Sequence, residues 1–246
     1  IGTLGTVLSG FAAAGAGIIG SFAGIGLAAA GAVIRMAAFR ESSLASLEAV
    51  TGSSMTAQRM FRNAMVMANQ TPADTQDVVR DMARFATAGF NERESGVMTA
   101  ATADLSAAFG RQQAESFAYV ASQLRSSGRS DRGDLRQLNS AGVNTGSILD
   151  SLGRQLNIQG ADQTATRAAV LARVRGGGVS GDQMLQGALS AISQRLDGGA
   201  ALGSFARRQS ETLTGALSNM ANASTNLLLG IDFSKIPGMV ALRQGI

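Results

Sequence analysis

The sequence contains no cysteine, histidine or tryptophan, and only one tyrosine, Tyr119. Without cysteine, the chain can form neither disulfides nor thiolate metal sites, and thiol catalysis is excluded. The lack of histidine removes the commonest general base near neutral pH and the commonest metal ligand. Few aromatic side chains remain on which nucleic-acid bases could stack. This composition argues against an enzyme, and we expect no catalytic residue, cofactor or metal.

Charge is missing from one end of the chain, because residues 1–34 contain no charged side chain and all 21 basic and 17 acidic residues follow them. About 20 apolar residues are enough for one helix to cross a bilayer. Ala16, Gly20, Gly24 and Ala28 are four residues apart, so they form a stripe of small side chains along one helical face. Such a stripe lets helix backbones approach closely. The segment is either a membrane-spanning helix or a Gly/Ala-rich helix packed inside a water-soluble assembly.

The remaining sequence has the pattern of helices. Alternating runs of β-branched and aromatic residues, which are typical of strands, never reach six residues. Residues that favour helices, such as Ala, Leu, Met, Gln and Arg, dominate instead. We therefore predict an all-α fold in which the apolar helical segment 1–34 is followed by a multi-helix, bundle-like domain over residues 35–230. Residues 231–246 are expected to link to a further part of a longer chain.

Capping residues and glycines predict where several helices begin and end. Thr71 is expected to cap a helix in which Pro72 takes the first position, and Gly89 is expected to end that helix. Asn91 is expected to cap the next helix. The last long helix is predicted over residues 202–229.

Positive charge is concentrated in the second half of the chain. Residues 126–246 hold twelve basic and eight acidic residues, whereas residues 35–125 hold nine of each. The excess indicates either contact with nucleic acid or an acidic surface, or arginines on solvated helix faces. Residues 134–157 superficially resemble a helix-turn-helix motif, but its second helix offers only Arg154 as a basic residue. Duplex binding depends on phosphate contacts and needs more positive charge than this.

A more specific pattern occupies the same segment. Six residues give the order Asp-Leu-x-Gln-Leu followed by Gly-Val: Asp134, Leu135, Gln137, Leu138, Gly142 and Val143. This order resembles the N-terminal domain of phage tail tape measure proteins. Other motifs of that family occur in the family's order between residues 36 and 225: Phe39-Arg40-Glu41, Thr51-Gly52-Ser53, Thr71-Pro72, Ala88-Gly89-Phe90, Gly178-Val179-Ser180, Gly198-Gly199 and the segment 211–219. The loop before Asp134 departs from the family, since Arg129 and Arg132 stand where the family often has Lys-Gly.

The resemblance implies a structural, non-enzymatic protein of the virion that is stored in the lumen of the tail tube and sets tail length. The partners it implies are further copies of the chain, the tail tube protein, tail tip or baseplate hub proteins and a tail assembly chaperone. Phage DNA would pass nearby without sequence recognition. On ejection, residues 4–34 could enter the host inner membrane and form a channel for DNA. A pore-forming helical toxin and a helical DNA-binding protein are the alternatives from other classes.

Overall fold

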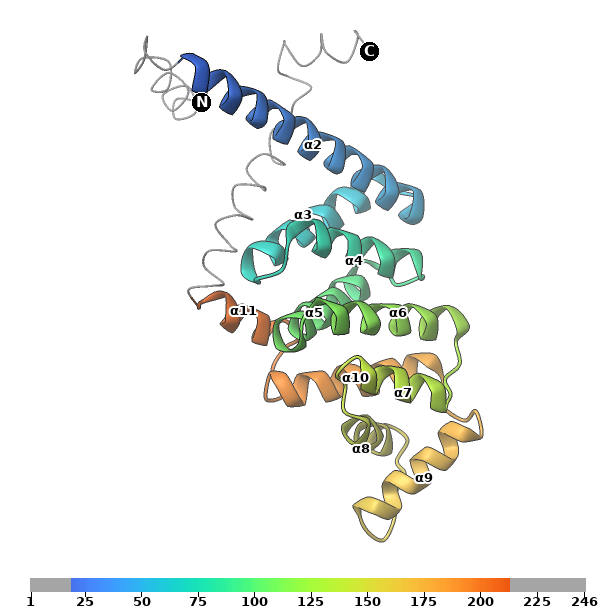
Figure 1. Ribbon diagram of the computed structural model, residues 1–246. Coiled ribbons are helices and arrows are strands. Elements are labelled where there is room, and N and C mark those ends of the chain that lie inside the picture. Colours follow the sequence, from blue (N-terminus) through green and yellow to red (C-terminus); the bar gives the residue numbers. More distant parts are fainter. Residues whose placement is uncertain (1–18, 213–246) are drawn as a thin grey trace. The chain divides into compact units, whose positions relative to one another are not determined.

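The computed structural model describes residues 19–212, with side chains from residue 35 onward. Within this range the chain forms helices and no strand, which confirms the predicted all-α fold there (Figure 1). In chain order the helices are α2 (Ile19–Thr51), α3 (Ser54–Gln70), α4 (Thr75–Thr87), α5 (Glu92–Phe109), α6 (Arg111–Ser127), α7 (Arg132–Ser140), α8 (Thr145–Gln155), α9 (Gln163–Arg175), α10 (Gly181–Leu196) and α11 (Ser204–Ser210).

The chain divides into two compact units, and the division falls within α2. One unit comprises Ile1–Glu41 with Leu228–Ile246, and the other comprises Ser42–Leu227. Of the first unit, the structure describes only the part of α2 that begins at Ile19. The second unit is described up to residue 212 and holds all the sites considered below.

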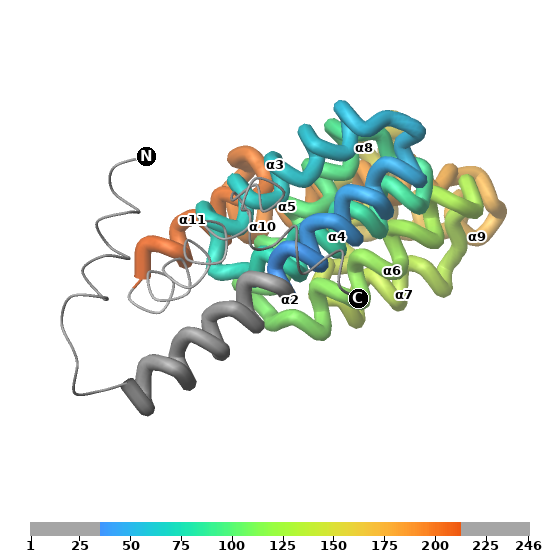
Figure 2. The backbone as a smooth tube through the Cα atoms, turned by 90° about the horizontal axis from the view of Figure 1, so that it is seen from above, coloured from blue at the N-terminus to red at the C-terminus, as the bar shows by residue number. Residues whose placement is uncertain are grey.

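In the Ser42–Leu227 unit, α5 is the central helix. It packs against α3, α4, α6, α10 and α11, and α6 in turn packs against α4, α7 and α10. On the other side of α10, α8 lies between α10 and α9. Helix α9 lies at one end of this unit (Figures 1 and 2), and Figure 1 shows α11 beside α5, nearer the middle. The last described helix returns to the first helix of the unit, because α11 also contacts α3.

The core of this unit follows from apolar residues spaced three or four apart on each helix. On α6, for example, Phe117, Ala121 and Leu124 are fully buried, and this spacing puts them on one helical face. They join Leu138 of α7 and Met184 of α10 in one apolar cluster. Burying such side chains supplies most of the free energy that folds the chain. The cluster therefore holds α6, α7 and α10 together.

The cap before α4 differs from the prediction. Asp74, not Thr71, is the capping residue, and its carboxylate accepts a hydrogen bond from the Gln76 amide at 2.7 Å. The Thr71 hydroxyl instead donates to the Met67 carbonyl at 3.0 Å, near the end of α3. Pro72 then follows the end of α3, where proline often stands because it cannot continue a helix. The prediction was wrong because the hydroxyl of a threonine between two helices can donate to a carbonyl of the preceding helix instead of capping the next helix.

The last helix is also shorter than predicted within the described range. Helix α11 begins at Ser204 and ends at Ser210, so it does not continue through residues 211 and 212. Both the amide and the hydroxyl of Thr212 donate to the Gln209 carbonyl, at 3.1 and 2.7 Å. These bonds span three residues, so the turn is tighter than an α-helix. The rest of the predicted helix, residues 213–229, lies outside the described residues.

Candidate interaction surface

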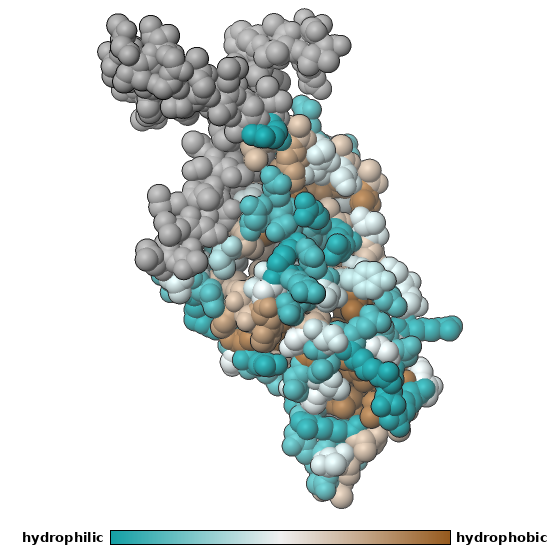
Figure 3. Space-filling model, in the orientation of Figure 1, coloured by the Kyte–Doolittle hydropathy of each residue, from teal (hydrophilic) through white to brown (hydrophobic). Residues whose placement is uncertain are grey.

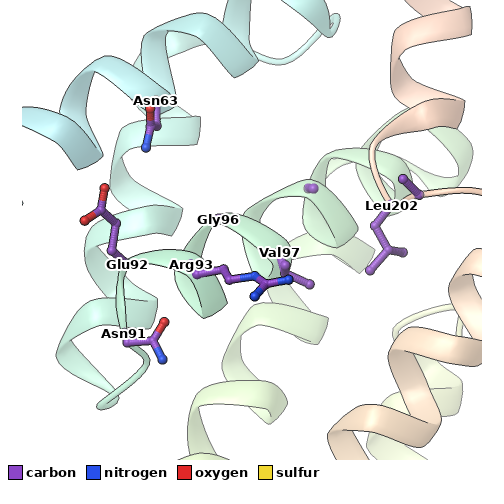
Figure 4. A pocket seen from close by; sticks show the side chains of 9 residues that line it. Asn63, Asn91, Glu92, Arg93, Gly96, Val97 and Leu202 are labelled. Atoms are coloured by element: carbon purple, nitrogen blue, oxygen red, sulfur yellow. The ribbon is translucent and has the colours of Figure 1, made fainter.

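A hollow in the described surface lies along α5, and we call it the α5 groove (Figure 4). Its volume is about 760 Å³, and it is bordered by α3 on one side and by the α10–α11 connection on the other. The residues that line it are Asn63, Asn91, Glu92, Arg93, Gly96, Val97, Ala100, Ala201 and Leu202. A smaller hollow of about 250 Å³ continues from it past Ala100 and Leu202 to Arg207. Together they offer an elongated surface of mainly small and apolar side chains.

Helices α3 and α5 form the groove because they run in the same direction with α4 as the return helix between them. Arg59 of α3 lies beside Glu92 at the start of α5, and Val66 lines the same hollow as Ala100 further along. The start of α5 is fixed by a capping box, in which Asn91 accepts from the Glu94 amide and Glu94 accepts from the Asn91 amide. Such reciprocal bonds satisfy amides that a helix leaves free at its start.

The floor of the groove is open at Gly96. No atom lies within 4 Å of the position that a β-carbon on Gly96 would occupy. Val97, the next residue, is 38% exposed, and Val66 across the groove is 54% exposed. Apolar side chains of this size are usually covered in a folded protein. The groove therefore offers apolar contact area and space above a glycine for an incoming side chain.

The charges around the groove are uneven. Glu92 is neutralised by Arg59, whose guanidinium donates to its carboxylate at 2.9 and 3.1 Å. Arg93 is exposed and has no ion pair with the described residues, although it lines both this groove and the neighbouring hollow between α5 and α10. Arg207 stands at the far end. The surface thus combines an apolar floor with uncompensated positive charge.

The hollow between α5 and α10 is built around Arg125 of α6. Its guanidinium donates to Glu94 of α5 at 3.1 Å and to Asp182 of α10 at 2.9 Å. It also donates to the Gly89 carbonyl and lies 5.0 Å from the centre of the Phe90 ring. These contacts raise the pKa of Arg125, the hydrogen bond to Asp182 being the largest cause. Arg125 therefore ties three segments together, and its charge is satisfied within the unit.

The family-motif residues form a helix and its turn. Asp131 and Asp134 make a capping box at the start of α7, and burial raises the pKa of Asp134. Three apolar members of the motif are buried: Leu135, Leu138 and Val143. Gly142 has a φ of +90°, which favours glycine, and the Val143 amide donates back to the Leu138 carbonyl at 3.0 Å. This bond closes the helix in the manner of a Schellman turn.

Gln137 is the exception among the motif residues, because its side chain is exposed. It lines a shallow hollow between α6 and α7 beside Tyr119, which is 64% exposed. The structure thus gives five of the six motif residues a role in the fold and leaves the Gln137 side chain exposed.

The small-residue stripe lies mostly beyond what the structure describes. Gly20, Gly24 and Ala28 fall in α2, but only the backbone is described there, and Ala16 lies outside the described residues. Their packing against another helix, and the entry of residues 4–34 into a membrane, therefore stay predictions. Among the helical residues whose side chains the structure describes, none forms a stretch long and apolar enough to span a bilayer.

Little surface of the predicted helix-turn-helix segment is free to contact DNA. The two helices exist as α7 and α8, but α8 is covered by α9 and α10. Only Arg154 and Gln155 of α8 are exposed. Asp150 on α8 is held by Arg167 of α9 at 2.6 Å, and this bond lowers the pKa of Asp150. A helix that lies between two others cannot enter a DNA groove in this conformation.

A buried acidic pair escaped the sequence analysis. Asp104 and Asp197 are both buried where α5, α10 and α11 meet. The signal that pointed to Asp104 is that it is the only charged residue between Ser95 and Gly110. Nothing in the sequence brings it to Asp197. The described residues hold no group of three acidic side chains that could bind a metal ion.

Comparisons with known proteins add no relative. The chain matches no protein-family model, no curated protein and no solved structure.

Proposed function

We propose that the chain is part of a tail tape measure protein of a tailed phage or phage-like particle, with a structural and not a catalytic role. The observation that carries the proposal is the ordered series of motifs between residues 36 and 225, with the segment Asp134–Val143 as its most specific member. In this proposal the protein lies in the tail tube and determines tail length together with the rest of its chain.

The positions of the motifs in the fold support this proposal indirectly. Ala88-Gly89-Phe90 turns the chain from α4 into α5, and Gly142-Val143 turns it from α7 towards α8. Gly178-Val179-Ser180 leads into α10, where Ser180 is the cap. Residues at helix ends determine the path of a helical chain. A series of such residues in one order is therefore a signature of one fold and not of composition alone.

The α5 groove is the surface that we propose for contacts with the other tail components. Its apolar floor suits a helix of a partner laid between α3 and α5, a common mode of helix recognition. Arg93 favours a partner segment that carries an acidic residue near its apolar face. A brown, apolar area is visible among teal, hydrophilic residues where α5, α10 and α11 come together in Figure 3.

The proposal is tested by locating the chain in purified particles. An epitope inserted between Gly176 and Gly177 would lie in the exposed connection between α9 and α10. We expect intact particles to contain the chain and to protect the epitope from protease. After ejection is triggered, the epitope should become accessible. A matched epitope on an outer tail protein should be cleaved before and after triggering.

Each result of this experiment decides a different part of the proposal. A chain that is absent from particles, or cleaved in intact ones, would contradict storage in the tail tube. Protected chain that partitions into host membranes after ejection would support the channel formed by residues 4–34. Protected chain that stays out of membranes would keep the tape measure function and remove the channel.

A further inference from the structure

Two carboxyl groups from distant parts of the chain hold the start of α11. Asp104 of α5 accepts hydrogen bonds from the amides of Gly203 and Ala206, at 2.5 and 2.9 Å. Asp197, at the end of α10, accepts from the Phe205 amide at 2.5 Å. Three backbone amides around the first turn of α11 therefore donate to these two acids. The acids act as caps of α11, although Asp104 lies far from it in the sequence.

The two acids also face each other. Asp197 accepts from the Phe205 amide and Asp104 from the next amide, that of Ala206, so the two carboxyl groups lie close together. The second carboxyl oxygen of Asp197 is buried and has no hydrogen-bond partner among the described residues. Two ionised carboxylates accept hydrogen bonds and cannot donate one. A hydrogen bond between them requires a proton on one of the two. Such a proton would give the unpartnered oxygen of Asp197 a hydrogen bond.

We propose that one proton shared by Asp104 and Asp197 fastens α11 to α5 and α10, and that loss of this proton loosens α11. The pair is a pH-dependent latch on the last described helix. Two carboxyl groups at close range cannot both ionise at low cost. When both Asp104 and Asp197 are deprotonated, their negative charges repel each other inside the protein. Moving α11 away admits water and relieves that repulsion.

Other charges near the latch do not replace the proton. On α11, the Arg208 guanidinium lies 3.8 Å from Asp197, but it is half exposed and donates instead to the Leu196 carbonyl at 2.8 Å. Arg207 is exposed and donates to the Gly203 carbonyl. The side of α3 that borders α11 presents Asn63, Val66, Met67 and Gln70, and the connection 198–203 is uncharged.

Burial is the main reason that the pKa of Asp104 is raised from 3.8 to about 6. The two amides that donate to Asp104 lower its pKa, and the neighbouring Asp197 raises it. A raised pKa in the folded state means that the folded chain binds the proton more tightly than the open one. The latch is therefore strongest below pH 4 and weakens as the pH rises to about 6. Over this range the population of chains with α11 open should rise roughly 100-fold.

Hydrogen exchange of the α11 amides measures this opening directly in the full chain. Protection factors for residues 203–212, corrected for the intrinsic exchange rate at each pH, should fall as the pH rises from 4 to 7. The matched control is α8, which should show no such fall because its one acid, Asp150, has its pKa lowered by Arg167 and stays ionised over this range. Protection of α11 that is independent of pH, or that changes in parallel with α8, overturns the latch.

Asp197→Asn is the sharpest variant, because an amide nitrogen at the unpartnered oxygen would donate to Asp104 without a shared proton. We expect α11 in this variant to stay protected and to lose its pH dependence. Persistence of the wild-type pH dependence overturns the proposal. Asp182→Asn, which changes an exposed acid of α10, serves as the control.

A measurement on the unaltered chain covers the case in which the variant does not fold. The carboxyl carbon of Asp104 should titrate by NMR with a pKa of about 6. Titration of Asp104 near pH 4 would overturn the shared proton.

Discussion

The amide nitrogen of Gly181 donates to the carbonyl oxygen of Gly128 at 3.1 Å, which holds the start of α10 against the end of α6. A β-carbon on residue 181 would overlap the carbonyl oxygen of Leu124. Backbone atoms cannot move aside as a flexible side chain can, so the close approach of the two helices requires glycine.

We expect Gly181→Ala to lower the free energy of unfolding by about 2–4 kcal/mol, because α6 and α10 must separate to admit the methyl group. Gly96→Ala is the matched control, since a β-carbon there meets no atom within 4 Å. In the interior of α5 that change should raise stability by about 0.5–1 kcal/mol. Urea denaturation measures the free energy of unfolding of both variants and so tests the two predictions. Equal effects would contradict the packing of α10 on α6.

Arg111 compensates the buried charge of Asp81. Its guanidinium donates to the two carboxyl oxygens at 2.8 and 3.2 Å, and the Asp81 side chain is only 4% exposed. Arg111→Met leaves this carboxylate unpaired and should cost about 3 kcal/mol near pH 7. Arg80→Met, which breaks an exposed pair with Asp77, should change stability by less than about 0.5 kcal/mol.

The loss in Arg111→Met should depend on pH in a definite direction. Burial already raises the pKa of Asp81, and removal of the neighbouring arginine raises it further. The variant should therefore regain stability as the pH falls and Asp81 takes up a proton, and lose it as the pH rises. Thermal unfolding at pH 5 and pH 7.5 measures the difference. A deficit that is equal at both values would show that Asp81 is not the group responsible.

The motif between Asp134 and Val143 holds five residues that build the helix and its turn and one, Gln137, whose side chain is exposed. Gly142→Ala should cost about 2 kcal/mol, because its φ of +90° suits glycine and a β-carbon would press on the Phe109 ring. Gln137→Ala should leave stability within about 0.5 kcal/mol of the wild type. Unfolding curves and incorporation into particles, measured for both variants, distinguish the two roles. Reduced incorporation of a stable Gln137→Ala would identify a contact surface on α7.

The α5 groove is tested by placing a charge on its floor. Val97→Glu should fold normally, because the side chain is 38% exposed, but it should reduce incorporation into particles by excluding an apolar partner. Val50→Glu is the control, since Val50 is equally exposed at 40% and lies outside the groove. If both variants are incorporated equally well, the groove is not the contact surface.

Local signals in the sequence predicted much of this fold. The end of α4 at Gly89 and the cap of α5 at Asn91 are as predicted, because each depends on residues within one helical turn. Thr71 was wrongly predicted as the cap of α4, because its hydroxyl can bond either to the end of α3 or to the start of α4. The end of α11 depends on Thr212 bonding to Gln209, which helix propensity does not reveal.

The candidate sites were harder to predict than the helices. The α5 groove exists because α4 returns the chain so that α3 and α5 lie side by side, and the pattern of one helix does not determine its neighbours. Asp104 and Asp197 meet across 93 positions of the sequence, through packing of α5, α10 and α11. Such long-range pairs follow from tertiary structure and leave no local periodicity.

The return of α11 to α3 has a consequence for the proposed tape measure function. A continuous helix over residues 54–210 would extend about 235 Å, at 1.5 Å per residue. In the described fold α11 instead lies beside α3, since Arg207 lines the same hollow as Val66 and Gln70. These residues would therefore add almost nothing to a distance counted along the chain. Insertions into their loops should leave tail length unchanged, whereas any event that unfolds the unit would release a long reserve of polypeptide.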